Sequence, residues 1–528
     1  MKEKNMRTIM QGAILLSVAS LIAKILSAVY RVPFQNMVGN TGFYVYQQIY
    51  PIYGIGMTFA LSGLPMFISK LVAESKSQAE KLAVLHQVFV LMVGFSLIVF
   101  FGLQGFAGQI AFAMGDGRLR PIIQAVSWMF LFSPFLSVSR GYFQGEYDMR
   151  PSASSQLVEQ TIRVAVILMV AYWAMRHHWD VYRMGTWAMS SAAIAAVFAS
   201  TVMVWFVSRY QVTFWRRPLA QPAYQYGTLA KRLLIEGGTI SLFASMMVLM
   251  QLVDSFTVKR GLVMHGLFDE QAKALKGIYD RGQPLVQLGL VVATSFASSL
   301  LPSLTEALSH NRQQQFRRLA KQMVRISLVI AAAATAGLIA LMPEINFFLF
   351  GDRQGNTMLS VYMLSIVFAT LIMIYNSILQ SLNAFRGTLV GLAVGVLVKL
   401  VITERSVVFM GAAGASWATV IALAVMTYML TRELRSLHLE VYQGNLVGKL
   451  VGLCILMVVG LRILIGLLHA FFGPALMMSR LGALLISGIG VATGVIFFVS
   501  MALRWRLLTL REWLMLPMAD KWLRFFSK

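Results

Sequence analysis

Long apolar runs dominate the sequence, and each is about as long as a helix that crosses a lipid bilayer. About 20 apolar residues span the hydrocarbon core as a helix. Such runs recur throughout the 528 residues, of which 58% are hydrophobic and 12% charged, whereas soluble domains are about 25% charged. We therefore predict an all-α polytopic membrane protein with about 14 transmembrane helices, at roughly residues 9–30, 43–67, 86–113, 121–143, 155–175, 184–207, 233–258, 279–303, 324–342, 358–382, 388–403, 409–430, 446–470 and 477–503.

Two parts of the chain resemble each other at a spacing of 235 residues. Six predicted spans make up each copy, an even number, so both copies have the same orientation in the membrane. Duplicated halves of this kind are typical of transporters, and transport is the first hypothesis. Three matched pairs illustrate the repeat: Lys24 with Lys259, Gly42 with Gly277, and Tyr44 with Tyr279.

The repeat predicts three parts of the chain. Residues 1–230 form an N-terminal six-helix bundle and residues 231–440 a C-terminal six-helix bundle. Residues 441–528 add two transmembrane helices and a basic cytoplasmic tail. The predicted fold is thus two parallel six-helix repeats plus two C-terminal helices.

The net charge of +24 predicts the orientation. With both termini inside, the inner loops and tails hold more Lys and Arg than the outer loops, as the positive-inside rule requires. The first apolar run is too long for a signal peptide and lacks a small-residue cleavage site, so we interpret it as a retained helix. No loop is large enough to form a nucleic-acid-binding module, and the basic loops are expected to face anionic lipid.

The first predicted helix carries one narrow polar stripe. Its polar residues fall within an arc of about 80° at 100° per residue. The stripe predicts a water-filled cavity that attracts an anion, although Lys24 and Arg31 can instead extend toward the outer interface. The stripe consists of Ser17, Ser20, Lys24, Ser27 and Arg31.

The fifth and seventh helices also carry ionisable residues, which are costly inside a membrane unless they face a cavity or a partner. Glu159 and Arg163 are spaced i, i+4 and can pair on one face, either at a substrate site or as a structural pair. Asp254 is the only acid deep in the seventh helix, where it binds a coupling proton or cation, or pairs with a neighbouring cation.

Asp280 and Arg281 lie at the outer mouth of the eighth helix. Adjacent helical residues point about 100° apart, so we expect Arg281 to face the cavity and Asp280 to orient it or a neighbouring helix. A guanidinium can hold phosphate oxygens through two parallel hydrogen bonds. The alternative is an interfacial ion pair outside the cavity.

The sequence lacks the residues that nucleotide hydrolysis, metal-dependent catalysis and a disulfide framework require. The chain has no Walker-type phosphate loop and no clustered acids or histidines for a metal-dependent enzyme. Its single cysteine, Cys454, lies in a predicted span and excludes a disulfide framework. We predict a protein that is not an enzyme and that has no cofactor or bound metal, with possible coupling to the membrane potential, H⁺ or Na⁺.

Two motifs resemble a known family. Residues 140–145 (Arg-Gly-Tyr-Phe-Gln-Gly) and 149–151 (Met-Arg-Pro), with Glu159, Gln160 and Arg163, resemble the stage V sporulation protein B group of the MATE-like, or MOP, superfamily. Tyr279-Asp-Arg-Gly and the later Leu301-Pro-Ser-Leu304 are similar to MurJ-type lipid II flippases.

The resemblance implies a flippase that moves an undecaprenyl-diphosphate-linked sugar, lipid II, to the outer leaflet for peptidoglycan synthesis. It implies a bacterial plasma-membrane protein that functions as a monomer, by alternating access. Matched motifs assign diphosphate binding first to Arg281, then to Lys24 and Arg31, with Asp280 as the neighbour of Arg281. Where some relatives carry acids or amides in the eleventh helix, this sequence has Lys399 and Thr403.

Three alternatives remain open at this point. The chain can export another lipid-linked precursor, for teichoic acid or capsule. A MATE-type cation or drug antiporter would need acidic cavity groups, and here the cations outnumber them. A membrane glycosyltransferase or ligase would need a catalytic constellation in an outer loop.

Overall fold

The structure, a computed structural model, is built from helices. It describes residues 2–215, 224–382, 384–436, 445–477 and 479–514, and these ranges contain no strand. The prediction of an all-α membrane protein is confirmed. The C-terminal part of the predicted basic tail, residues 515–528, lies outside the described residues.

Eleven helical stretches in the described ranges are long and apolar enough to cross a membrane, or twelve if a bent helix pair counts as one span. The prediction of 14 is therefore not reproduced in number. The span predicted at 43–67 and all but the first six residues of that predicted at 9–30 fall within one continuous stretch, Leu15–Glu74. The helix over the span predicted at 279–303 is not among the eleven.

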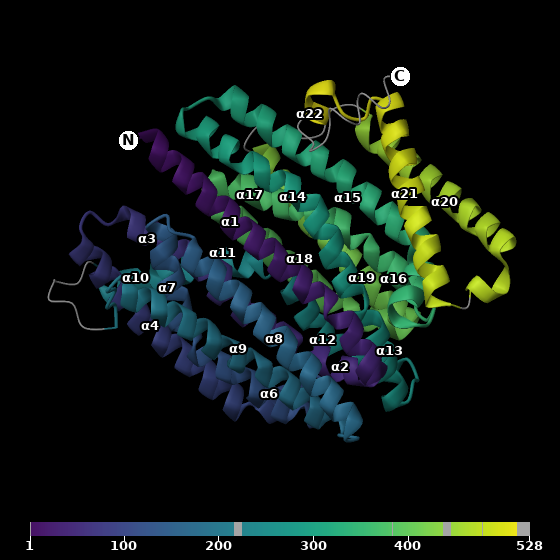
Figure 1. Ribbon diagram of the computed structural model, residues 1–528, viewed down its shortest axis with the longest axis horizontal. Coiled ribbons are helices and arrows are strands. Elements are labelled where there is room, and N and C mark those ends of the chain that lie inside the picture. The colour runs from purple at the N-terminus through teal and green to yellow at the C-terminus, as the bar shows by residue number, and fades with distance from the viewer. Residues whose placement is uncertain (1, 216–223, 383, 437–444, 478, 515–528) are drawn as a thin grey trace. The chain divides into compact units, whose positions relative to one another are not determined.

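The chain divides into two compact units, Met1–Asp280 and Arg281–Lys528. The predicted boundary at residue 230 follows the sequence repeat and stays a prediction, whereas this division leaves the first helices of the second copy with the first unit. The helices of the first unit, all labelled in Figure 1 except α5, are α1 (Lys2–Val29), α2 (Arg31–Thr58), α3 (Leu64–Glu74), α4 (Gln78–Gly105), α5 (Ala107–Ala113), α6 (Arg120–Ser127), α7 (Ser133–Gly145), α8 (Arg150–Arg176), α9 (Val181–Arg209), α10 (Tyr226–Arg232), α11 (Gly238–Ala244), α12 (Met246–Met264) and α13 (Asp269–Asp280).

Helix α2 lies at the centre of the first unit. It packs against α8, α9, α12 and α13, while α8 packs against α1 and α9. Its apolar side joins a core that includes Phe34, Phe43 and Ile49. The helix is interrupted at Gly39, whose φ of 69° falls in the left-handed region that favours glycine.

Small residues allow α2 and the segment after it to approach α11–α13 closely. A Cβ at Gly277 would collide with the backbone carbonyl of Asn40, and one at Gly63 would collide with Ser241. Close backbone approach through small residues is how helices associate where lipid removes the hydrophobic driving force. Between α11 and α12 the chain bends by 72° at Ser245.

The second unit is organised around the long helix α15, which packs against α14, α17, α20 and α21. Helices α20 and α21, the two C-terminal spans, lie side by side (Figure 1). The helices of this unit are α14 (Gly282–Ser309), α15 (Gln313–Phe350), α16 (Asn356–Met363), α17 (Ser365–Ser381), α18 (Phe385–Met410), α19 (Ala412–Ser436), α20 (Leu446–Met477), α21 (Arg480–Arg504) and α22 (Leu510–Leu514).

Candidate functional site

A buried arginine lies among tyrosines in the first unit. Arg163 on α8 donates from Nη2 to the hydroxyl of Tyr46 at 2.8 Å and to that of Tyr30 at 3.3 Å. Its guanidinium carbon lies 3.7 Å from the ring centroid of Tyr53. Only 1% of Arg163 is exposed, so the charge is held by hydroxyls and ring faces in place of water.

A second arginine joins the same group. Arg31, the first residue of α2, is 1% exposed, and its guanidinium carbon lies 4.2 Å from the ring centroid of Tyr50. The Tyr50 ring is also 5.6 Å from the guanidinium carbon of Arg163. Both cations therefore lie close to one aromatic ring. We call Tyr30, Arg31, Tyr46, Tyr50, Tyr53 and Arg163 the arginine–tyrosine cluster.

The arginine–tyrosine cluster is positively charged. Among the described residues, neither Arg31 nor Arg163 forms an ion pair, and the Nε atom of each has no hydrogen-bond partner. Cation–π contacts and hydroxyls compensate part of the desolvation cost of a buried guanidinium, but a full counter-charge compensates more. Two such cations side by side can bind an anion with more than one negative oxygen.

Glu159 is not the partner of Arg163, as its i, i+4 spacing allowed. The Glu159 carboxylate accepts from Nη2 of Arg140 on α7 at 2.7 Å, and both side chains are almost fully buried. Arg140 also donates to Ser155 and to the carbonyl of Ala60. This pair ties α7 to α8 and leaves Arg163 to the tyrosines.

The polar stripe of the first helix meets α8. Ser20 donates to the side-chain oxygen of Gln156 at 3.1 Å, so the polar faces predicted on α1 and α8 come together at this point. Lys24, one turn further along α1, is exposed, and in the described part of the chain it has no hydrogen bond or ion pair. Its predicted role in substrate binding stays a prediction.

The two acids predicted on α12 and α13 have partners within the first unit. Asp254 is fully buried and accepts from the Tyr279 hydroxyl at 3.0 Å. Asp280 is fully buried and pairs with Lys276, one turn earlier, at 2.6 Å. Asp280 thus orients a lysine of its own helix. The predicted ion coupling through Asp254 stays a prediction.

Arg281 begins the second unit and binds a carboxylate there. Its Nη1 and Nη2 each lie 2.7 Å from one oxygen of Asp352, and Nη1 also donates to Asn346 at 3.2 Å. Arg281 is 2% exposed. Burial raises the pKa of Asp352, but the hydrogen bonds from Arg281 outweigh burial and hold that pKa below its usual value.

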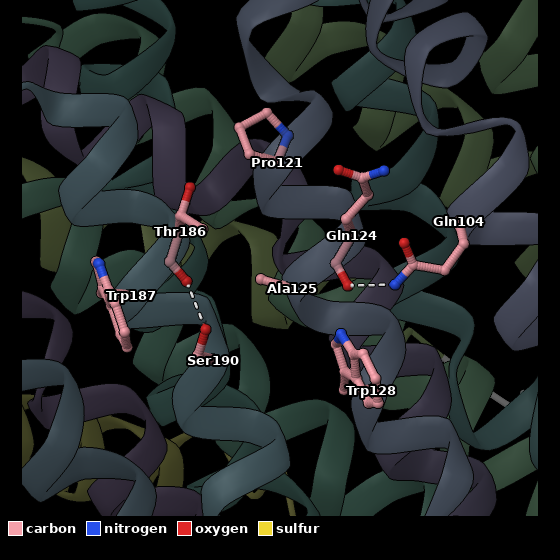
Figure 2. Close-up of a pocket in the computed structure, with 8 residues that line it drawn as sticks. All are labelled: Gln104, Pro121, Gln124, Ala125, Trp128, Thr186, Trp187 and Ser190. Carbon is pink, nitrogen blue, oxygen red and sulfur yellow. Dashed lines mark hydrogen bonds between the residues drawn. The ribbon is translucent and has the colours of Figure 1, made fainter.

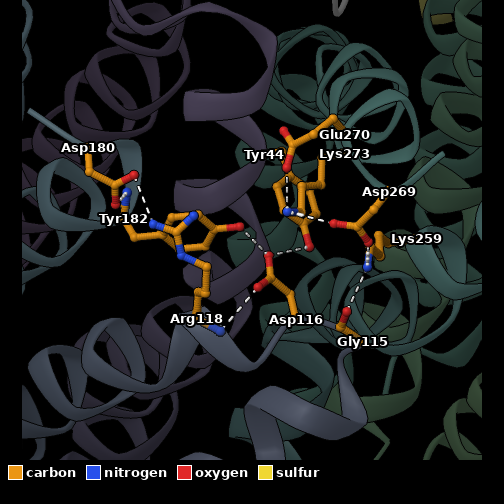
Figure 3. Close-up of polar contacts among 10 residues, drawn as sticks. All are labelled: Tyr44, Gly115, Asp116, Arg118, Asp180, Tyr182, Lys259, Asp269, Glu270 and Lys273. Carbon is orange, nitrogen blue, oxygen red and sulfur yellow. Dashed lines mark hydrogen bonds and ion pairs between the residues drawn. The ribbon is translucent and has the colours of Figure 1, made fainter. Parts of the chain in front are cut away.

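A further polar network joins residues of α2, α9, α12 and α13 to the connection between α5 and α6 (Figure 3). Tyr44 and Tyr182 both donate to Asp116, at 3.3 and 2.7 Å. Asp269 pairs with Lys259 and with Lys273. Lys259 also donates to the carbonyl of Gly115. These contacts join α12 and α13 to the α5–α6 connection and to α9, and we call this network the Asp116 clasp.

An open groove of about 450 Å³ lies on the same unit, between α4, α6 and α9 (Figure 2). None of its lining residues is charged, and two tryptophans stand on opposite walls, on α9 and next to α6. The groove therefore lacks the cations that an anionic headgroup requires. It is lined by Gln104, Pro121, Gln124, Ala125, Trp128, Thr186, Trp187 and Ser190.

The tyrosines, Arg140 and Asp352 were not among the predicted site residues. Tyr46, Tyr50 and Tyr53 are spaced four and three residues apart, which places them on one helix face, and this spacing could have identified them. Arg140 lies within the motif on which the family resemblance rests. Asp352 has no signal in the sequence, because its contact with Arg281 depends on tertiary structure.

The fold and its buried cations define a class of membrane transporter. The solved structure titled "Lipid II flippase MurJ, inward closed conformation" superposes with a TM-score of 0.70 at 14% identity, covering 93% of this chain and 99% of that one. An inward-facing MATE family multidrug transporter of the MOP superfamily superposes with a TM-score of 0.64 at 12% identity, over 80% of this chain and 97% of that one. The chain therefore has the MOP-superfamily fold.

Within that superfamily, the chain belongs to the polysaccharide biosynthesis protein family, whose model matches residues 9–308. The "Lipid II flippase MurJ" model matches residues 278–482. The uncharacterized membrane protein YabM of Bacillus subtilis (strain 168) is 34% identical over 98% of this chain and 97% of its own length. Lipid II flippase MurJ of the same strain is 25% identical over 78% and 79%. The resemblance inferred from the motifs is confirmed.

Proposed function

We propose that this protein moves lipid II, an undecaprenyl-diphosphate-linked sugar, from the inner to the outer leaflet of a bacterial plasma membrane, as a monomeric flippase without catalytic activity. The arginine–tyrosine cluster carries the proposal. It places two buried guanidiniums, neither of them in an ion pair among the described residues, 4.2 and 5.6 Å from the centroid of one tyrosine ring. A diphosphate is the part of the substrate that such a pair would bind.

The physical task explains why a cluster of this kind is needed. A charged sugar headgroup cannot cross hydrocarbon unaided, because its polar groups would lose water without replacement. Guanidiniums bind phosphate oxygens through paired hydrogen bonds, and aromatic hydroxyls and ring faces can contact the sugars. The prenyl tail can stay in lipid while the headgroup passes through the protein by alternating access.

The direction of transport follows from charge and topology. With both termini in the cytoplasm, a membrane potential negative inside favours outward movement of a diphosphate, by about 2.3 kcal/mol per charge per 100 mV. Asp254 is the residue at which a coupling H⁺ or Na⁺ would bind. Reporter fusions at the two ends of the chain test this orientation, and an outward-facing terminus would contradict it.

The proposal is tested by depleting the protein in its host, in a strain without a redundant flippase. Labelled lipid II should become inaccessible to a probe added outside. Wild type should restore access and Arg163→Ala should not, whereas Arg176→Ala, which removes an exposed arginine from the end of the same helix, should restore it.

Two results would contradict the proposal. Unchanged access on depletion would exclude lipid II as the substrate, and teichoic-acid and capsule precursors measured in the same cells would then identify the alternative. Full restoration by Arg163→Ala would exclude the arginine–tyrosine cluster as the binding site.

A further inference from the structure

Arg281 presents the geometry of a phosphate site that a carboxylate of the same chain already fills. Both Nη atoms of Arg281 lie 2.7 Å from the two oxygens of Asp352. Carboxylate and phosphate oxygens accept from a guanidinium in the same paired arrangement. We call the two Nη atoms of Arg281 the Arg281 fork. The Asp352 carboxylate must leave this fork before a phosphate can bind there.

The site around Asp352 holds more cationic groups than one carboxylate needs. Arg480, the first residue of α21, acts electrostatically on Asp352, as Arg281 does. Its guanidinium packs so closely on Gly351 that a Cβ there would collide with it. Asn346 on α15 is fully buried, and its side-chain oxygen accepts from Nη1 of Arg281 and helps to hold it. If Asp352 moved away, the guanidiniums of Arg281 and Arg480 would remain to bind an anion.

The chain around Asp352 contains two glycines at which the backbone can turn. Asp352 lies in the connection between α15 and α16, where Gly351 (φ 82°) and Gly355 (φ 73°) are both left-handed. A glycine at each end of a three-residue segment lets the backbone turn at both points at low cost. The side chain of Asp352 is 31% exposed, whereas that of Arg281 is 2% exposed. Solvent or a ligand therefore reaches the pair from the Asp352 side.

The attachments of this segment are few and polar. Gln354 donates its backbone N–H to Asp352 and accepts from Asn346 through its carbonyl. Arg353 makes long contacts, 3.3 and 3.5 Å, to Glu344. Partly exposed ion pairs of this kind contribute only about 0–1 kcal/mol, which is small enough for a bound ligand to offset.

We propose that Asp352 is an internal competitor of the anionic headgroup: it occupies the Arg281 fork in the empty protein, and a phosphate of the substrate displaces it and moves the segment from Gly351 to Gly355. This inference rests on the proposed function, because it takes the substrate to be a diphosphate. According to this inference, Asp352 lowers the affinity of the protein for its substrate. The segment from Gly351 to Gly355 is then a gate that moves when a phosphate binds to Arg281.

Binding of farnesyl diphosphate, a short prenyl diphosphate, to the purified full-length protein in nanodiscs tests the competition. Asp352→Asn removes the competing charge at nearly constant shape, so affinity should rise by roughly fivefold, the equivalent of about 1 kcal/mol. Arg281→Ala should lose affinity, and adding Asp352→Asn to it should give no gain. Glu512→Gln removes an equal charge that pairs with Arg325 and makes no contact with this segment among the described residues, and should give no gain either.

Unchanged or weaker binding by Asp352→Asn would overturn the proposal, because Asp352 would then position Arg281 for the ligand. An equal gain from Glu512→Gln would also overturn it, since net charge alone would explain the effect. Hydrogen exchange of residues 351–355 gives a second readout, with inorganic pyrophosphate as the probe. Exchange should increase on adding pyrophosphate to wild type and should already be high in Asp352→Asn.

The two proposals fail in different ways. If wild type binds farnesyl diphosphate and exposes the segment but does not move lipid II, the proposed function fails while the competition stands. If wild type moves lipid II while the segment stays protected and Asp352→Asn binds no better, only the competition fails.

Discussion

Buried arginines occur in two contrasting surroundings in this protein. In the first unit, Arg163 is surrounded by tyrosines and has no carboxylate partner in the described residues. In the second unit, Arg281 is equally buried but holds Asp352 through both Nη atoms. Arg140, one helix away from Arg163, is neutralised by Glu159 in the same way as Arg281. Arg140 and Glu159 are both almost fully buried, and breaking such a pair destabilises the fold. The Asp352 partner of Arg281 is partly exposed and can be displaced, and Arg163 carries a charge that a ligand can compensate.

The largest effect should come from breaking a neutralised pair. Arg140→Leu leaves Glu159 buried without its partner, which should cost about 3–5 kcal/mol of unfolding free energy. Thermal unfolding in detergent measures this loss. The double variant Arg140→Leu/Glu159→Leu should recover most of it. A single variant as stable as wild type would show that the pair is not structural.

Removing Arg163, which has no ion pair in the described residues, should weaken ligand binding without lowering stability, in contrast to Arg140→Leu. Arg163→Leu should leave stability unchanged or increased, because no buried carboxylate loses its partner. Binding of a prenyl diphosphate should weaken by roughly 10- to 100-fold, the equivalent of about 1.5–3 kcal/mol for hydrogen bonds to a charged group. If Arg163→Leu unfolds as easily as Arg140→Leu and binds normally, the contrast between the two arginines is wrong.

Removing one hydroxyl from the arginine–tyrosine cluster should have a smaller effect. Tyr46→Phe removes a hydroxyl that positions the Arg163 guanidinium from 2.8 Å. Losing this positioning hydrogen bond, worth about 0.5–1.5 kcal/mol, should weaken prenyl diphosphate binding by roughly two- to tenfold. Tyr182→Phe removes a hydroxyl from the Asp116 clasp and serves as the control. Equal losses in both variants would point to a general packing effect.

The smallest effect should come from acidifying the Asp116 clasp. Burial raises the pKa of Asp269, but Lys259 and Lys273 outweigh it and lower that pKa below its usual value. A lowered folded-state pKa contributes stability that is present at neutral pH and is lost as the pH falls below about 3.9, through the folded pKa. Because Asp269 is half-exposed, the loss should stay below about 1 kcal/mol. Hydrogen exchange of α13 should increase at that pH, and Asp269→Asn should abolish the change.

The sequence predicts much of the fold and less of the site. Apolar runs predict the helices because crossing a bilayer constrains length and composition directly. The number of spans is harder to predict, because a turn at Tyr30 and a break at Gly39 divide the helices within one apolar stretch. Partners were the hardest to predict. Glu159 had two arginines within reach, and only the packing of α7 on α8 selects Arg140.

The sequence repeat likewise does not predict the partners of charged residues. Lys24 and Lys259 are equivalent in sequence, but Lys24 is exposed on α1 whereas Lys259 is buried in the Asp116 clasp with Asp269. A repeat predicts equivalent positions along two helices and does not predict what packs against each. Function therefore has to be read from the surroundings of each copy.

The glycine shared by both copies has a consequence for how the two halves can diverge. At Gly277 an added methyl group would meet the backbone of Asn40, whereas at Gly42 it would meet side-chain atoms of Val38. A compensating mutation can reshape a side chain but cannot remove a carbonyl. Position 42 can therefore change together with its neighbour, whereas position 277 requires glycine as long as α13 packs against α2 in this way.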